Sequence, residues 1–297
     1  MLSYTKCQLC PRQCGVNREA GVRGFCQMPG ALFAARAAAH FWEEPIISGS
    51  FGSGAVFFSG CTLRCCFCQN APISANGFGA ALTSAQLRKI FERLIDEGCQ
   101  NINLVTPTQF LPSILPALSP KLPVPVVYNC GGYERVETLR ALEGLVDIYL
   151  PDYKYADPAL AGRLSAAPDY PHIAQVAILE MLRQTGPCQI VDGELRRGTL
   201  VRHLVLPGFV DNSLAAVEWL AQTAIPRGAM VSIMGQYVPM PGMIPPLDRR
   251  VSAEEYAAVL SWAQLCGIKD GFFQDLDSAS AAYIPDFSLQ GLDAQNS

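Results

Sequence analysis

Four cysteines lie within the eight residues of the segment CTLRCCFC, residues 61–68. Three of them, Cys61, Cys65 and Cys68, have the spacing C-x3-C-x2-C. A structural zinc site takes four ligands, usually from two paired C-x2-4-C units, and the adjacent side chains of Cys65 and Cys66 would point in different directions. Three thiolates suit a [4Fe–4S] cluster better, because they hold three irons and leave the fourth iron free to bind another ligand. We therefore predict a cluster at the three spaced cysteines and expect Cys66 to pack behind the loop without binding metal.

A second group of four cysteines lies near the N-terminus, where Cys7, Cys10, Cys14 and Cys26 have the spacing C-x2-C-x3-C-x11-C. Four thiols in so short a segment complete either an all-cysteine zinc site or a second [4Fe–4S] cluster. Because four thiolates leave no open coordination position, this centre would be structural or would relay electrons. The other cysteines are scattered and are expected to pack as small apolar side chains: Cys99, Cys130, Cys188 and Cys266.

Composition limits the classes of protein to which the chain can belong. Of its 297 residues 50% are hydrophobic and 16% are charged, which is typical of a globular chain with one large core. A net charge of −4 argues against nucleic acid or an anionic membrane surface as partner. No apolar run is long enough to span a membrane and the start lacks a signal-peptide core, so we expect a cytoplasmic protein. In that reducing compartment, twelve cysteines indicate metal ligation rather than disulfides.

From about residue 53, strand-like and helix-like segments alternate along the chain. Six strands are predicted, and the fifth follows a hairpin that turns at Asp192-Gly193. They are 55–59, 101–105, 125–129, 146–150, a strand within 188–206, and 229–234. The helices between them are predicted at 84–97, 109–118, 134–142, within 157–185, from about Asn212, and after Ser252. Capping boxes are expected at Thr83 with Gln86 and at Ser252 with Glu255.

Six strand–helix units predict a parallel sheet with helices outside, because parallel strands need crossover connections. Six strands are too few for the closed eight-stranded barrel, so a partial barrel or an open sheet is expected, with its site at the carboxyl ends of the strands. We divide the chain into a cysteine-rich metal-binding module (1–50), a partial barrel (51–275) and a loosely packed C-terminal tail (276–297).

The cysteine loop, with Phe67 before its last thiol and a strand directly before it, resembles the signature of the radical S-adenosylmethionine (radical SAM) enzymes. The resemblance covers roughly residues 51–275 and implies a (β/α)6 partial barrel. It is closest to the pyruvate formate-lyase-activating-enzyme-like branch that carries an N-terminal cysteine motif. The motifs that carry it are CQLCPRQCGVNREAGVRGFC, GSGAVFFSGC and CFCQN.

This resemblance implies a reaction. An iron of the [4Fe–4S] cluster would chelate SAM, and one electron from the reduced cluster would break the S–C5′ bond to give a 5′-deoxyadenosyl radical. The radical would abstract hydrogen from a protein or peptide, as in the glycyl-radical activases, and a flavodoxin or ferredoxin would be the reductant. Such an activating-enzyme-like protein would be an oxidoreductase. Two alternatives stay open: a radical SAM enzyme that acts on a small molecule, and a non-catalytic iron–sulfur or zinc protein that transfers electrons.

The resemblance also implies roles for polar residues at the strand ends. Activating enzymes have an Asp-x-Lys after the fourth strand that helps to hold SAM, and LPDYKY supplies Asp152 and Lys154 there. They have an arginine on the fifth strand before a Pro-Gly, and VRHLVLPG offers Arg202. At the sixth strand end Gln236 or Tyr237 offers a polar contact. An ordinary surface ion pair is the alternative for Asp152 and Lys154.

The family's Gly-Gly-Glu segment, which receives the amino group of SAM after the second strand, is missing. VTPTQF stands there, so Thr106 and Thr108 would have to supply hydroxyl or backbone acceptors. Asn129, at the end of the third strand, completes the predicted cofactor-binding set. Glu43 and Glu44 are expected on a solvated turn, with the alternative that one of them reaches the substrate.

Overall fold

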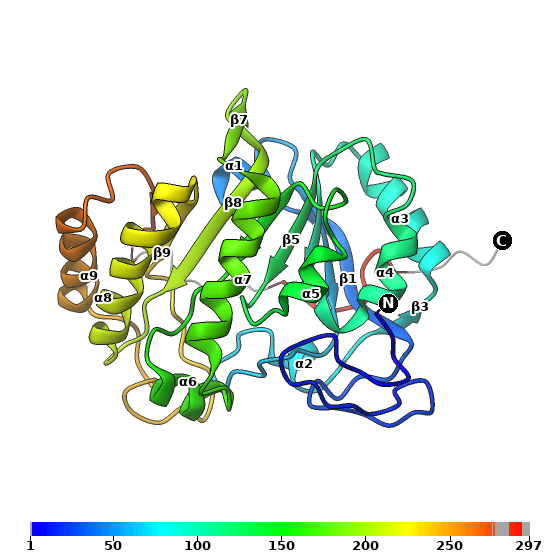
Figure 1. Ribbon diagram of the computed structural model, residues 1–297, viewed down its shortest axis with the longest axis horizontal. Coiled ribbons are helices and arrows are strands. Elements are labelled where there is room, and N and C mark those ends of the chain that lie inside the picture. The colour runs from blue at the N-terminus through cyan, green and yellow to red at the C-terminus, as the bar shows by residue number, and fades with distance from the viewer. Residues whose placement is uncertain (1, 275, 277–284, 293–297) are drawn as a thin grey trace.

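The computed structural model describes residues 2–274, 276 and 285–292 of the chain. Its strands form one sheet in the order β10-β9-β8-β6-β5-β4-β2-β1-β3, with β7 paired to β8 (Figure 1). The strands are β1 Leu32–His40, β2 Ser53–Phe58, β3 Ala80–Leu82, β4 Ile102–Val105, β5 Val126–Cys130, β6 Ile148–Pro151, β7 Gln189–Val191, β8 Glu194–Leu204, β9 Met230–Met234 and β10 Phe272–Phe273.

The six predicted strands are confirmed as β2, β4, β5, β6, β8 and β9, and each of them is parallel to its neighbour in this series. The two edge strands of the described sheet, β3 and β10, do not pair with each other, so the sheet is open as in a partial barrel. The α/β fold class is therefore confirmed.

Helices connect these strands. They are α1 Pro45–Ser48, α2 Ala71–Ser74, α3 Ser84–Asp96, α4 Leu111–Ala117, α5 Val136–Arg140, α6 Pro158–Ser165, α7 Tyr170–Thr185, α8 Val210–Trp219 and α9 Ala253–Leu265. Both predicted capping boxes are present, at the start of α3 and at the start of α9. The hairpin between β7 and β8 turns at Asp192 and Gly193, both of which have positive φ.

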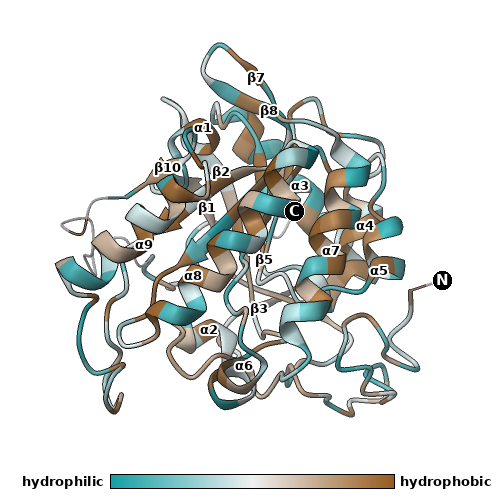
Figure 2. Ribbon diagram, turned by 60° about the vertical axis from the view of Figure 1, so that its left-hand side comes forward, coloured by the Kyte–Doolittle hydropathy of each residue, from teal (hydrophilic) through white to brown (hydrophobic). Residues whose placement is uncertain are grey.

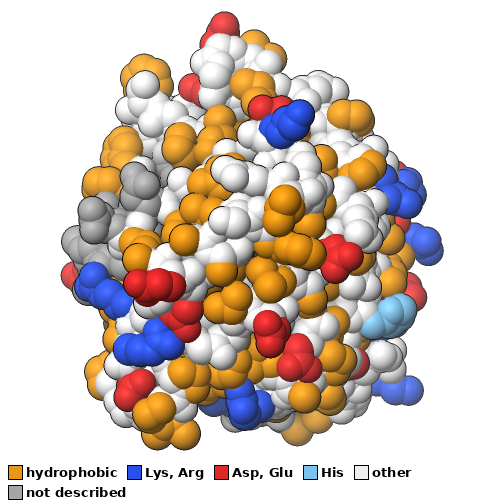
Figure 3. Space-filling view, turned by 90° about the vertical axis from the view of Figure 1, so that its left-hand side faces the viewer, with side chains coloured by type: hydrophobic (Ala, Val, Ile, Leu, Met, Phe, Trp, Pro, Cys, Tyr) orange, Lys and Arg blue, Asp and Glu red, His pale blue; other side chains and the backbone are white. Residues whose placement is uncertain are grey.

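The helices pack their apolar faces on the sheet (Figure 2). One core cluster lies between the sheet and α3, α4 and α5, and a second contains residues of α7, α8 and α9. Burial of these side chains removes apolar surface from water and stabilises the sheet. On the face formed by α8 and α9, acidic and basic side chains are interspersed among hydrophobic ones (Figure 3). No helix in the described part of the chain is long and apolar enough to cross a membrane.

Strand β1 was not expected. It lies inside the range assigned to the N-terminal module and pairs antiparallel with β2. Its sequence, LFAARAAAH, is rich in alanine, a residue that is depleted in strands, so it gave no strand signal. The described part of the C-terminal tail packs on this strand, where the N–H of Leu289 donates to Ala35 O at 3.1 Å and the N–H of Ala37 donates to Gln290 O at 2.9 Å. Loose packing is therefore wrong for residues 285–292, while 277–284 and 293–297 lie outside the described residues.

The two ends of the sheet differ. Helix α1 and the β7–β8 hairpin lie at one end, whereas α2, α6 and the N-terminal segment lie at the other (Figure 1). Ile47 of α1 packs with Val127, Ile148 and Leu150 of the neighbouring strands β5 and β6. The second end carries the carboxyl ends of the parallel strands, because α2 and α6 follow β2 and β6 in the chain.

Candidate functional site

A cavity of about 270 Å³ lies among the carboxyl ends of the parallel strands. All three spaced cysteines of the loop after β2 line it. The other predicted site residues that line it are Thr106, Asn129, Asp152, Lys154, Arg202, Gln236 and Tyr237. The structure thus brings together residues from six different strand ends, as the parallel topology requires.

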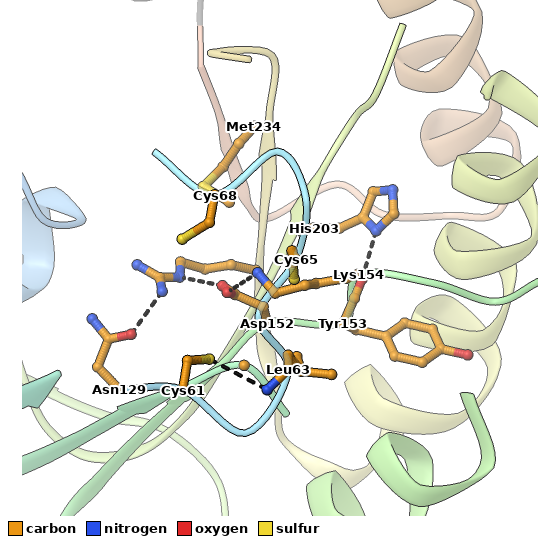
Figure 4. A network of polar contacts seen from close by, with 12 residues as sticks. Cys61, Leu63, Cys65, Cys68, Asn129, Asp152, Tyr153, Lys154, His203 and Met234 are labelled. Carbon is orange, nitrogen blue, oxygen red and sulfur yellow. Dashed lines mark hydrogen bonds and ion pairs between the residues drawn. The ribbon is translucent and has the colours of Figure 1, made fainter. Parts of the chain in front are cut away.

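Each of the three thiols in the loop receives a hydrogen bond (Figure 4 shows the cysteines). Cys61 Sγ accepts from the backbone N–H two residues later at 3.4 Å. Cys65 Sγ accepts from the hydroxyl of Ser165 at 3.0 Å, and Cys68 Sγ accepts from the hydroxyl of Ser74 at 3.2 Å. Donors aimed at sulfur stabilise thiolate and tune the potential of an iron–sulfur cluster.

The thiols also influence one another electrostatically. Burial, together with the charges of the neighbouring Cys65 and Cys68, raises the pKa of Cys61 to about 12. Burial and Cys65 raise the pKa of Cys68, which Lys154 lowers. Thiols release their protons when they bind a metal centre. Within the described residues, no three His, Cys, Asp or Glu side chains gather closely enough for a single metal ion. A cluster takes one thiolate per iron, so these three cysteines fit it.

A network of charged side chains forms the wall beside the cysteines (Figure 4). Asp152 accepts from Lys154 Nζ at 2.5 Å and from Arg202 Nε at 3.0 Å. Arg202 Nη2 donates to Asn129 Oδ1 at 2.8 Å. Burial by itself raises the pKa of Asp152, but the cations of Arg202 and Lys154 outweigh it and lower that pKa below its ordinary value. All three ionisable groups are therefore charged at neutral pH, in a place where water is mostly excluded.

The wall contains a second carboxylate, which the sequence favoured as part of a solvated turn. Glu43, from the segment between β1 and α1, accepts from Asn129 Nδ2 at 2.8 Å and from Asn103 Nδ2 at 3.2 Å. It also forms an ion pair with Arg202 Nη1 at 3.4 Å. Glu44 is 4% exposed, and burial raises its pKa. The expectation that these two glutamates lie on a solvated turn is therefore wrong. The only feature of the sequence that could have indicated their burial is the Pro-Ile-Ile that follows, which anchors α1 on the inside of the sheet.

The two threonines after β4 point to different places. Thr106 has a φ of +58° and lines the cavity. Thr108 does not line it, because its hydroxyl donates to Glu134 Oε1 at 2.6 Å in the buried interior. Burial raises the pKa of Glu134 to about 7.

Gln236 and Tyr237 both border the cavity after β9, but the Tyr237 hydroxyl already donates to Leu247 O at 2.7 Å.

Cys66 is exposed and does not line the cavity, and its backbone N–H donates to Leu164 O at 2.9 Å. The expectation that Cys66 packs behind the loop is therefore wrong. In the N-terminal motif Cys7, Cys10 and Cys26 are buried and the fourth cysteine is exposed.

Solved structures give the chain a fold neighbour. Streptococcus suis SuiB bound to precursor peptide SuiA superposes with a TM-score of 0.50 at 13% identity, over 72% of this chain and 46% of SuiB. SuiB bound to S-adenosylmethionine gives a TM-score of 0.47 at 12% identity, over 74% of this chain and 45% of SuiB. The chain thus spans less than half the length of SuiB, and the first likeness shows a shared fold.

No family model matches the sequence. A full-length comparison finds the uncharacterized protein MJ0674 of Methanocaldococcus jannaschii, which is 31% identical over 274 residues. The match covers 88% of this chain and 75% of that protein. Identity and coverage of this extent place the chain in the same family as the M. jannaschii protein MJ0674.

Proposed function

We propose that this protein is a radical SAM enzyme. The observation that carries the proposal is that Cys61, Cys65 and Cys68 line one cavity together with the Asp152–Arg202 ion pair. Neither the cysteines nor the ion pair would indicate this function alone, because three thiols could belong to an electron carrier and a buried ion pair could be structural. Their common cavity, at the strand ends of a SuiB-like fold, supports a cofactor site beside a cluster.

The chain's own residues would hold and orient the cofactors. The three thiolates would bind a [4Fe–4S] cluster that, when present, supplies the electron that breaks the S–C5′ bond of SAM to give a 5′-deoxyadenosyl radical. Lys154 and Arg202 place two cations where the carboxylate of SAM can be held. Thr106, Asn129 and Gln236 offer further polar groups along the wall. Leu63 and Phe67, which also line the cavity, keep water from the radical.

We propose a protein or peptide as substrate, with a glycyl-radical-activase-like reaction as the most specific form of this hypothesis. The SuiB neighbour is bound to a precursor peptide, which supports this class. A flavodoxin or ferredoxin would supply the electron. A small-molecule substrate is the second candidate, favoured by Glu43 and Asn129, which provide fixed polar groups inside the sheet.

The proposal is tested anaerobically. The protein is reconstituted with iron and sulfide, reduced with dithionite and mixed with SAM, and 5′-deoxyadenosine is quantified. We expect formation in the wild type and in Cys266→Ala, a control at the end of α9, and none in Cys65→Ala. A wild-type protein that carries no iron at the loop and binds no SAM would overturn the proposal in favour of a non-catalytic metal protein.

A further inference from the structure

The N-terminal segment is held by turns and by contacts with the rest of the chain rather than by regular secondary structure. Residues 2–31 contain no helix or strand among the described residues. Their own apolar cluster is small and centres on Tyr4, Cys7 and Leu9. Two backbone hydrogen bonds join Cys7 to the chain that follows, from its N–H to Val16 O and from the N–H of Gly15 to its carbonyl. A segment with so small a core takes its stability from elsewhere, and a bound metal centre is the usual source.

A buried cation lies at the middle of this segment. Arg18 is 1% exposed, and its guanidinium donates to the carbonyl oxygens of Met28 at 3.0 Å, Pro29 at 2.7 Å and Gln109 at 2.6 Å. No carboxylate in the described part of the chain lies within ion-pair distance of it. A buried charge without a counter-charge is destabilising. The carbonyls, and the rings of Tyr4 and Phe110 that also face the guanidinium, carry no net charge, so an anion beside Arg18 would stabilise it.

Beyond these carbonyl oxygens, the guanidinium also contacts a thiol. Arg18 Nη1 lies 3.7 Å from Cys7 Sγ. On the outer side of the segment, Cys14 Sγ accepts from the backbone N–H of Phe25 at 3.3 Å. One sulfur of the motif thus lies beside a cation and another accepts from a backbone N–H, and both kinds of contact stabilise a thiolate.

We propose that Cys7, Cys10, Cys14 and Cys26 hold a [4Fe–4S] cluster and that Arg18 balances its negative charge. Four thiolates outweigh the positive charge of the cluster core, so the centre is a buried anion. That anion supplies the missing partner of the guanidinium.

The cluster site lies directly beside the loop of Cys61. The carbonyl oxygen of Cys26 is 2.8 Å from the position that a Cβ on Gly60 would occupy, so the N-terminal segment and the cysteine loop are in contact there. Arg12 donates from Nε to Thr62 O at 3.0 Å and from Nη2 to Ser165 O at 2.7 Å.

This position suits an electron relay, an inference that rests on the proposed function. A low-potential flavodoxin-type carrier would lose one electron at the exposed Cys14 side. The N-terminal cluster would gain that electron and pass it on to the loop, returning to its oxidised state. A zinc ion has no redox chemistry and could serve only as a structural centre.

Metal content tests the cluster without any need for SAM. In the triple variant Cys61→Ser, Cys65→Ser, Cys68→Ser the loop cannot bind a cluster, whatever its function. After anaerobic reconstitution we expect roughly four irons and four sulfides per chain, with an electron paramagnetic resonance signal on reduction. Adding Cys14→Ser, at the exposed position, should abolish the signal. One zinc per chain and no iron would overturn the proposed N-terminal cluster. That result would not contradict the radical SAM function proposed for the loop of Cys61.

The role of Arg18 has its own readout. In the same triple variant, Arg18→Gln removes the cation, so the midpoint potential of the remaining cluster should become more negative, while Arg18→Lys should keep it near the wild-type value. A potential that is equal in the Gln and Arg forms would show that Arg18 is not the counter-charge.

The electron relay is tested with the loop intact. Reduction of the loop cluster by flavodoxin should be at least tenfold slower in Cys14→Ser than in the wild type, and an unchanged rate would exclude the relay.

Discussion

Asp152 and Arg202, which lie 50 residues apart in the chain, are joined twice: by an ion pair of 3.0 Å and by an isolated parallel bridge between their backbones. The backbone connection continues at the next residue, where the N–H of Tyr153 donates to Arg202 O at 2.7 Å. The side-chain pair is therefore fixed by the pairing of two neighbouring strands. It does not depend on long side chains finding each other in solvent.

Removal of this carboxylate should be costly. Asp152→Asn leaves Arg202 and Lys154 partly buried, with Glu43 as the one carboxylate still paired with Arg202. We expect the free energy of unfolding to fall by about 3 kcal/mol in urea denaturation, because breaking a buried pair leaves uncompensated charge. The matched control is Glu92→Gln, which breaks the exposed Arg88–Glu92 pair of α3 and should cost about 0.5 kcal/mol. Equal losses in both variants would show that the Asp152 pair behaves as a surface pair.

A glycine beside the site should be irreplaceable. Gly132 has a φ of +77°, and a Cβ there would collide with the carbonyl of Asp152 and lie 3.1 Å from the Tyr170 hydroxyl. Gly144 has a similar φ of +83° with open space around it, so Gly144→Ala measures the backbone strain alone. We expect Gly132→Ala to lose about 2 kcal/mol more stability than Gly144→Ala, because backbone must move. It should also weaken SAM binding to the reconstituted protein in calorimetry, which Gly144→Ala should leave intact.

The sequence was most informative where topology alone decides position. Asp152, Lys154 and Arg202 follow or lie on parallel strands, and the carboxyl ends of parallel strands meet at one edge whatever the details of packing. The structure therefore brings them together as expected, while their role in binding SAM stays a prediction.

Position was not predictable where tertiary packing decides it. Glu43 reaches the cavity because Ile47 anchors the following turn inside the sheet, and such a contact has no periodic signature. Thr108 turns away from Thr106 because a short 3-10 helix begins there, in which successive side chains are rotated by about 120°. Strand β1 was missed because its alanines become strand-like only through pairing with β2.

A buried histidine should make the protein acid-sensitive. Burial lowers the pKa of His203 from 6.5 to about 4, and the neutral ring donates from Nδ1 to Tyr153 O and accepts at Nε2 from Ser213. Between these values the unfolded chain takes up a proton that the folded protein does not, so this histidine alone should lower the free energy of unfolding by roughly 3 kcal/mol as pH falls from 6.5 to 4. In urea denaturation the wild type and His172→Gln, at an exposed histidine, should each lose this amount relative to His203→Gln over that range.

Glu134 should act in the opposite direction. Burial raises its pKa from 4.5 to about 7, so between these values the folded protein keeps a proton that the unfolded chain has lost. Its contribution to stability is complete below pH 4.5 and is lost as the pH rises through 7. Glu134→Gln mimics the protonated carboxyl and lacks this loss. From pH 5 to pH 8 the variant should therefore gain roughly 3 kcal/mol of unfolding free energy relative to the wild type.

The control for this comparison is Glu137→Gln, three residues further along, where the side chain is 67% exposed. Its unfolding free energy should track that of the wild type at both pH values, because the substitution lies in solvent and leaves the buried Glu134 carboxyl unchanged. A constant difference between Glu134→Gln and the wild type at pH 5 and pH 8 would mean that Glu134 is ionised throughout. The Thr108 hydroxyl would then bind a carboxylate, and the turn after β4 would be held by charge rather than by a neutral hydrogen bond.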